Sequence, residues 1–98
     1  LKRVDEGIRE LEAALALKGD DFDALVSAGM AYRQKGNLPK AVELLEKATK
    51  VRPDDAVAWS NLGVAKSKTE DKDGAVAALK KAIMLDYNNA TTHFNLGV

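Results

Sequence analysis

Two pairs of adjacent aspartates are the residues whose type and spacing best suit metal chemistry. Asp20-Asp21 and Asp54-Asp55 offer carboxylate oxygens, the ligands that Mg²⁺ and Ca²⁺ prefer. Aspartate is also a favoured cap at a helix start, because its side-chain oxygen accepts a hydrogen bond from a free backbone N–H. Each pair stands directly before helical sequence, so we interpret both as caps and predict no metal site.

No other residues form a recognisable catalytic set. His93 is the only histidine, and no nucleophile can be paired with it, so we assign it a packing role. The glycines stand singly and form neither a phosphate loop nor a dinucleotide fingerprint. Cysteine is absent, which removes disulfides, thiolate catalysis and thiolate metal ligands. We therefore predict a protein that is not an enzyme and binds no cofactor.

Composition limits the partners of the chain. The 98 residues are 46% hydrophobic and 31% charged, and 15 basic residues balance 15 acidic ones. Without a basic block, the chain lacks the charge pattern that attracts nucleic acid or anionic lipid. No apolar run approaches the roughly 18 residues needed to span a bilayer. These features favour a soluble, cytoplasmic protein that binds neither nucleic acid nor membrane, although the absence of cysteine does not fix the compartment.

The sequence repeats with a period of 34 residues. Three series of identical residues follow this period: Gly29, Gly63 and Gly97; Leu11, Leu45 and Leu79; Ala14, Ala48 and Ala82. Apolar residues recur at helical spacing, and no stretch alternates as a strand would. A repeat of this length accommodates one pair of helices. The sequence therefore predicts an all-α fold.

Caps and breaks divide each period into two helices. Asp20-Asp21, Asp54-Asp55 and Asn88-Asn89 share one phase and should cap the first helix of each unit. Gly36-Asn37 interrupts the first full period, and Pro39 fits the first turn of the helix that follows. The predicted units are the second helix of a preceding repeat (1–19), two full repeats (20–53 and 54–87) and the start of a further repeat (88–98).

At these residues the sequence resembles the tetratricopeptide repeat family, whose signature is W-x2-L-G-x2-Y, then A-x3-F and a late proline. The first full unit reads Leu25-x2-Ala28-Gly29-x2-Tyr32, then Ala41-x3-Leu45, Ala48 and Pro53. The second reads Trp59-x2-Leu62-Gly63-x2-Lys66, then Ala75-x3-Leu79 and Ala82. The resemblance covers essentially the whole chain and implies a right-handed α-solenoid of antiparallel helix pairs.

The second unit departs from the family pattern at several places. Lys66 stands in the tyrosine slot, Glu70 in the turn-glycine slot and Tyr87 in the late-proline slot. If Glu70 adopts the left-handed conformation that glycine supplies there, the cost is about 1 kcal/mol. Gly74, which opens the next helix, adds a helix-propensity penalty of about 1 kcal/mol.

The resemblance implies that the first helix of each unit lines a concave groove in which a protein or extended peptide docks. The lining slots of the first full unit are Asp23, Val26, Ser27, Met30, Arg33 and Gln34. Those of the second are Val57, Ser60, Asn61, Val64, Ser67 and Lys68, and the last unit offers Thr91, Phe94, Asn95 and Val98. The apolar lining residues could bury groups of a peptide while amides and hydroxyls bond its backbone.

Two features narrow the kind of ligand. Asn61 and Asn95 lie one period apart, and similar proteins hold peptides with such a ladder; the alternative is that these are solvated amides. Chaperone-binding members of the family clamp an acidic C-terminus with lysine, arginine and asparagine side chains. Only Asn61 matches that set here, and without cations a buried carboxylate is not neutralised, so we do not expect this function.

The sequence thus predicts a protein–protein interaction module without catalysis of its own. An alternative is a targeting or regulatory segment of a larger enzyme such as a transferase. Base-by-base RNA recognition is disfavoured because the expected groove contains only Arg33 and Lys68 as cations. Leu96 and Val98 would need a following helix to cover them, so we expect either that further chain covers this face or that molecules associate end to end through it.

Overall fold

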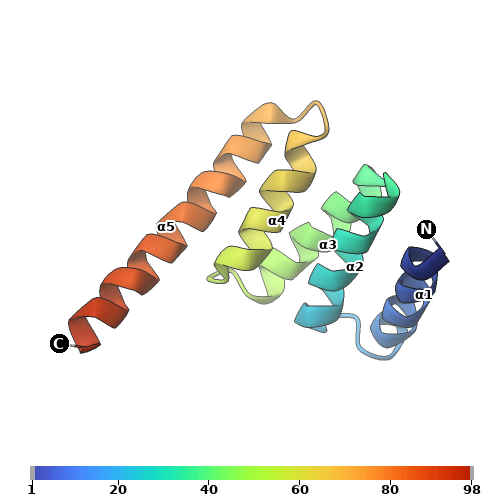
Figure 1. Cartoon of the computed structure of the whole chain (residues 1–98), viewed down its shortest axis with the longest axis horizontal. Helices are drawn as coiled ribbons and strands as arrows, with labels where there is room; N and C mark the ends of the chain where they lie inside the picture. Colours follow the sequence, from blue (N-terminus) through green and yellow to red (C-terminus); the bar gives the residue numbers. More distant parts are fainter. Residues whose placement is uncertain (1, 98) are drawn as a thin grey trace.

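The computed structural model describes the backbone of residues 2–97 and the side chains of residues 3–87. Within that range the regular structure is helical. The helices are α1 (Lys2–Leu17), α2 (Phe22–Lys35), α3 (Leu38–Val51), α4 (Ala56–Ser67) and α5 (Lys72–Gly97). They follow one another along a molecule that measures 47 × 31 × 22 Å, with α2 and α4 running opposite to α1, α3 and α5 (Figure 1).

The two predicted aspartate caps each begin a helix. The Asp21 carboxylate accepts a hydrogen bond from the Ala24 N–H at 3.2 Å, and the Asp55 carboxylate accepts one from the Val57 N–H at 2.9 Å. Asn37 caps α3 in the same way. These bonds satisfy backbone donors that a helix start leaves free. The interpretation of Asp21 and Asp55 as caps is therefore confirmed.

We expect removal of a capping carboxylate to cost far more stability than removal of its neighbour. Asp21→Ala or Asp55→Ala should lower the free energy of unfolding by about 0.5–2 kcal/mol, because each leaves a helix-start N–H without its partner. Asp20→Ala and Asp54→Ala change exposed residues beside the caps and should stay within about 0.5 kcal/mol. Urea unfolding followed by helical circular dichroism measures all four. Equal losses at both members of a pair would contradict the assignment.

The helices stack by regular translation. Along the described chain each helix packs on the next one in sequence, and the only further helix pair in contact is α2 with α4. A closed bundle would bring α1 or α3 against α5, which does not occur. The arrangement confirms the predicted all-α solenoid of antiparallel helix pairs, in which each pair covers the apolar face of its neighbour.

The core contains many small residues. Its buried cluster comprises Phe22, Leu25, Val26, Ala28, Ala41, Leu44, Leu45, Ala48, Ala58, Leu62, Ala65 and Ala78. Alanine at an interface lets helix axes approach toward the short end of the usual 8–10 Å range. The large side chains fill the remaining space, and burying each one stabilises the fold by about 1.5–3 kcal/mol.

Gly29 and Gly63 each pack against a leucine of the following helix. A Cβ atom on Gly29 would lie 2.6 Å from Leu45 Cγ, and a Cβ on Gly63 would lie 2.6 Å from Leu79 Cγ. Both distances are far below van der Waals contact. The same glycine–leucine contact therefore joins the first and second helices in both full units, and this explains why both residues recur every 34 residues.

The two turns within repeats differ. Gly36 ends α2 with φ of 91°, the left-handed conformation expected for that slot. Among the described residues no non-glycine residue has positive φ, so Glu70 does not adopt this conformation and its expected cost is not incurred. Lys68 instead ends α4 at φ −88° and ψ −3°. A different turn thus replaces the glycine-dependent one.

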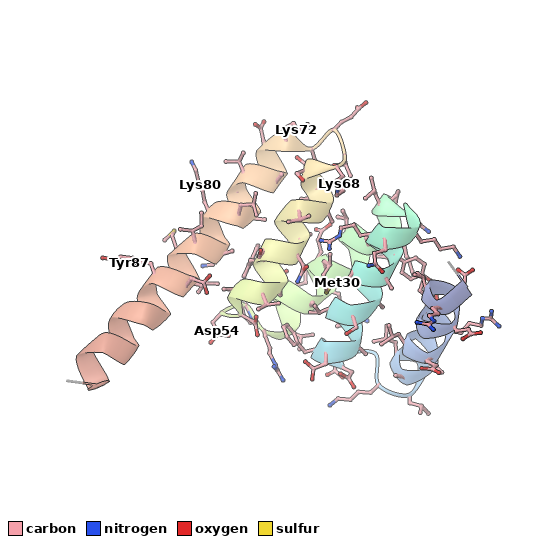
Figure 2. The ribbon with its side chains drawn as sticks, in the orientation of Figure 1. Met30, Asp54, Lys68, Lys72, Lys80 and Tyr87 are labelled. Atoms are coloured by element: carbon pink, nitrogen blue, oxygen red, sulfur yellow. The ribbon has the colours of Figure 1, made fainter. Side chains whose placement is uncertain are left out.

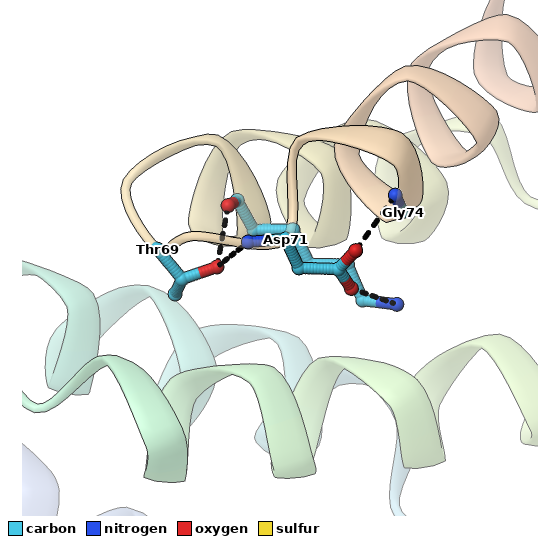
Figure 3. Close-up of polar contacts among 4 residues, drawn as sticks. Thr69, Asp71 and Gly74 are labelled. Atoms are coloured by element: carbon cyan, nitrogen blue, oxygen red, sulfur yellow. Dashed lines mark hydrogen bonds and ion pairs between the residues drawn. The ribbon is translucent and has the colours of Figure 1, made fainter.

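Side chains tie this second turn together, as Figure 3 shows. The Thr69 hydroxyl donates to the Lys66 carbonyl and accepts from the Asp71 N–H. The Asp71 carboxylate accepts a hydrogen bond from the Gly74 N–H at 2.9 Å, and Lys66 Nζ lies 3.7 Å from its other oxygen. A Cβ on Gly74 would lie only 2.2 Å from that carboxylate. Glycine at position 74 therefore leaves room for the Asp71 carboxylate that caps α5, although glycine has a low helix propensity.

Helix α5 corrects one expectation. Asn88-Asn89 does not begin a new helix, because α5 continues through both residues to Gly97. In the first repeat Pro53 stands in the late-proline slot two residues beyond the end of α3, and proline can neither donate a backbone N–H nor let its predecessor stay helical. Tyr87 occupies that slot at the end of the second repeat, and it imposes neither restriction.

Specific polar contacts join neighbouring units. Lys35 Nζ lies 2.5 Å from Asp5 Oδ1, which ties the end of α2 to the start of α1. This hydrogen bond lowers the pKa of Asp5 below its usual value. The Tyr32 hydroxyl donates to the Glu12 carboxylate of α1.

No helix within residues 2–97 combines the length and apolar character required to cross a bilayer.

Candidate functional site

The expected groove residues with described side chains lie on α2 and α4, except Lys68, which directly follows α4. These helices run in the same direction and touch one another, with α4 one repeat further along the solenoid (Figure 1). Their lining positions correspond at the 34-residue period, so that Ser27 matches Asn61 and Met30 matches Val64. We use "groove surface" for the following residues: Asp23, Ser27, Met30, Arg33, Gln34, Val57, Ser60, Asn61, Val64, Ser67 and Lys68.

The apolar members differ in exposure. Val57 is 58% exposed and Met30 is 40% exposed, while Val64 is half-buried. Figure 2 shows Met30 midway along α2. Val26 was expected in the lining, but it is only 8% exposed and belongs to the core cluster. Its side chain offers little surface to a ligand, so Val26 is excluded from the groove surface.

A cleft of about 180 Å³ lies over the first turns of α4. Ala56, Val57, Ser60 and Asn61 form one wall, and Asp86 of α5 completes it. The sequence analysis missed Asp86, because it belongs to a second helix, whereas only first helices were expected to line the groove. Antiparallel packing of α4 and α5 brings Asp86 into the cleft. No sequence pattern links Asp86 to Val57, which is 29 residues earlier.

Asn61 uses part of its hydrogen-bonding capacity within its own helix. Its side-chain Nδ2 donates to the Val57 carbonyl at 3.0 Å. The side-chain oxygen is an acceptor of the kind a peptide N–H requires. Ser67 is held similarly, since its hydroxyl donates to the Val64 carbonyl at 2.6 Å. These bonds restrict the rotamers of both side chains and so reduce the entropy that a ligand contact would cost.

Charges separate to the two ends of the groove surface. Asp23 lies in the first turn of α2, and Asp86 stands beside the first turn of α4. Arg33 lies in the last turn of α2, and Lys68 caps the end of α4. Because the two helices are parallel, the acidic residues share one end and the basic residues the other. Figure 2 shows Lys68 at the basic end.

The third part of the expected groove is placed differently from the prediction. Thr91, Phe94 and Asn95 belong to the continuous helix α5 and not to a separate first helix of a further repeat. Their side chains, and that of His93, lie outside the described ones. The Asn61–Asn95 ladder and the packing role of His93 therefore remain predictions.

Other hollows lie on the second helices and were not anticipated from the sequence. One of about 570 Å³ runs along α3 beside Pro39, Val42, Glu43, Glu46, Lys47 and Lys50. Another of about 260 Å³ lies between α1 and α3 and includes Leu15, Tyr32 and Leu44. Within the described part of the chain no three side chains of the metal-binding types gather into a cation site.

Comparison with known families decides the classification. A family model described as TPR repeat matches residues 29–70, and one described as tetratricopeptide repeat matches residues 56–89. The two ranges together span more than half of the chain. The chain belongs to the tetratricopeptide repeat (TPR) family. The Gly29–Leu45 and Gly63–Leu79 contacts are thus the structural counterparts of TPR signature positions in this chain.

Solved structures share the TPR fold of this chain. A crystal structure of MamA matches with a TM-score of 0.82 at 30% identity, over 91% of this chain and 54% of MamA. A second MamA crystal structure gives 0.76 at 31% identity, over 86% and 46%. The MamA RS-1 ArsTM double mutant gives 0.84 at 25% identity, over 90% and 49%. The TPR chain spans about half the length of these structures, and no protein of curated function matches its sequence.

Proposed function

We propose that the groove surface binds an extended segment of a partner protein, and that the chain acts as an interaction module without catalysis of its own. The observation that carries this proposal is the cleft beside Val57, Ser60 and Asn61. It combines an exposed aliphatic side chain with a hydroxyl and an amide. Peptide sites need this combination, because apolar contact supplies affinity and polar groups satisfy the peptide backbone.

The spacing of apolar residues defines where a ligand side chain would sit. Val57 and Val64 are seven residues apart on α4 and lie on one side of that helix, and Met30 holds the position on α2 that corresponds to Val64 at the 34-residue period. Methionine is flexible and adapts to differently shaped partners. The ligand therefore has one or two aliphatic or aromatic side chains, placed between backbone groups that bond to Asn61 and Ser60.

The separated charges set the direction of the ligand. Asp23 and Asp86 favour a basic residue at their end, and Arg33 and Lys68 favour an acidic residue at the opposite end. A reversed peptide would bring like charges together. The groove surface should therefore prefer the order of charges in one peptide over the same residues in reverse, with a preference that weakens as salt rises.

Selection from a displayed library of random peptides tests the proposal. Peptides retained by the chain should carry an apolar centre with opposite charges at its two sides. Met30→Asp combined with Val57→Asp should weaken their binding at least tenfold, measured by fluorescence anisotropy, because each change places a charge against an apolar ligand group. Both residues are exposed, so the fold should be retained in circular dichroism.

Leu17→Asp is the matched control. Leu17 is 92% exposed and lies outside the groove surface. Its change removes one apolar side chain and adds one negative charge, as each of the two groove substitutions does by itself. Peptide affinity should be unchanged in this variant. A selection that yields no peptide sensitive to Met30 and Val57, or yields peptides lost equally in the control, would contradict the proposal.

A further inference from the structure

The cleft over the first turns of α4 has an equivalent one repeat earlier, where the chain fills the space itself. At the 34-residue period Ala56 corresponds to Phe22, and Asp86 corresponds to Arg52. Phe22 is only 8% exposed, and the guanidinium carbon of Arg52 lies over its ring, 4.4 Å from the ring centre. An arginine over an aromatic face is a favourable contact. In the first full unit, an arginine that follows the second helix therefore covers the start of the first helix.

The second full unit changes both partners of this contact. Ala56 removes the aromatic ring, and Asp86 replaces the arginine by a residue of opposite charge. Both residues line the cleft of about 180 Å³. The second unit therefore presents an open space and a negative charge at the place that an arginine covers in the first.

The polar groups of the cleft are mainly hydrogen-bond acceptors. A carboxylate such as that of Asp86 only accepts, and among the described side chains none forms an ion pair with it. The side-chain nitrogen of Asn61 already donates to the Val57 carbonyl, so its oxygen is the group that it offers to a ligand. The ligand group that complements this set is a cation with several N–H donors.

Arginine meets these requirements better than lysine does. Its guanidinium carries five N–H donors in a planar fork that matches a carboxylate, whereas an ammonium is a compact point charge. Its methylene stem can pack on the side chain of Val57, which is 58% exposed. The cleft is smaller than the roughly 300–1,000 Å³ of sites that hold drug-sized ligands, so it suits a single side chain.

The charges around the cleft also favour a cation. Asp54 and Asp55 directly precede α4, and Figure 2 shows Asp54 at this end of the helix. The Asp55 carboxylate accepts from the Val57 N–H, so a negative group already offsets the positive end of the helix dipole. Lys66 and Lys68 lie at the opposite end of α4. A cationic side chain is therefore attracted to this end of the groove surface.

We propose that the cleft is a specificity pocket for one arginine side chain of the partner segment, and that the guanidinium pairs with the Asp86 carboxylate. The arginine then takes the place in the repeat that Arg52 takes in the first unit. This inference rests on the proposed function, because the arginine belongs to the segment that the groove surface binds. The arginine lies at the acidic end of that segment's site, to one side of its apolar centre.

A double-substitution cycle between peptide and chain tests the pairing. Peptides retained in the selection should carry this arginine, and replacing it by citrulline, which has the same shape without the charge, should weaken binding about tenfold in fluorescence anisotropy. In Asp86→Asn, which lacks the carboxylate charge, the same replacement should change affinity less than about threefold. Asp54→Asn is the matched control. It removes an equal charge at the same end but outside the cleft, so arginine peptides should lose less than about threefold.

Ala56→Phe combined with Asp86→Arg tests the origin of the pocket. The pair gives the second unit the residues of the first, so the fold should be retained in circular dichroism while arginine peptides bind at least about tenfold more weakly. Retained peptides that need Met30 and Val57 but lack arginine, or that lose equally on citrulline replacement with and without Asp86, would overturn this inference and leave the proposed function standing. A selection that retains no peptide dependent on Met30 and Val57 would overturn the proposed function, and this inference with it.

Discussion

Leu45→Ala is expected to lower the free energy of unfolding by about 2–5 kcal/mol. Leu45 is fully buried at the centre of the first full repeat. Its branched end lies against the backbone of α2 at Gly29, a residue that has no side chain to move into a void. The substitution therefore removes buried apolar area and leaves a cavity that the surrounding helices cannot readily close.

Urea unfolding followed by helical circular dichroism measures this effect, and the midpoint should fall in proportion to the lost free energy. Leu17→Ala is the control, because Leu17 is the same residue type in a nearly fully exposed position. It should change stability by less than about 0.5 kcal/mol. A loss below about 1 kcal/mol for Leu45→Ala would show that the repeat relaxes around the cavity.

Much of the fold could be predicted from the sequence because its main determinants are local or periodic. A capping aspartate acts on an N–H two or three residues away, as Asp21 and Asp55 do, so its effect is visible in a short stretch of sequence. The Gly29–Leu45 contact is longer in range, but it recurs as Gly63–Leu79. Repetition therefore marked both residue types as part of the repeat, but only the structure shows that they touch.

The errors fall where one repeat departs from the other. The family pattern places a turn glycine in the slot of Glu70, which left a left-handed conformation there as one option. Thr69, Lys66 and Asp71 instead form another turn, whose bonds depend on side chains that the family signature does not specify. The rule for Asn88-Asn89 assumed a break in the helix before the cap. A cap residue can begin a helix only where the preceding one has ended, and Tyr87 does not end α5.

The candidate site was predictable in outline and not in detail. Met30 and Val57, which the family phase assigned to the groove, are exposed on α2 and α4. The same phase also placed Val26 in the groove, because phase gives the direction of a side chain and not how closely the neighbouring helices cover it. Asp86 enters the cleft only through antiparallel packing of α4 and α5, which is a property of three-dimensional structure that residue spacing within one helix does not express.

Gly29→Ala is expected to destabilise the wild-type chain by about 1–3 kcal/mol, although alanine is the better helix former by about 1 kcal/mol. The new Cβ would lie 2.6 Å from Leu45 Cγ, and Leu45 is enclosed on all sides. In the Leu45→Ala background the obstructing atoms are gone. There the same substitution should stabilise the chain by up to about 1 kcal/mol, so that the sign of its effect reverses.

Gly7→Ala supplies the control for helix propensity. Gly7 lies within α1, and a Cβ there would meet no atom within 4 Å. It should stabilise the chain by up to about 1 kcal/mol in both backgrounds, since it is remote from Leu45 and its effect should be additive. A Gly29→Ala variant that behaved like Gly7→Ala in both backgrounds would show that close approach to Leu45 is not the reason for glycine here. If the stability change reverses sign for Gly29→Ala alone, glycine is required at this position because Leu45 packs against it. The recurrence of both residues every 34 positions would then follow from the close spacing of the helices.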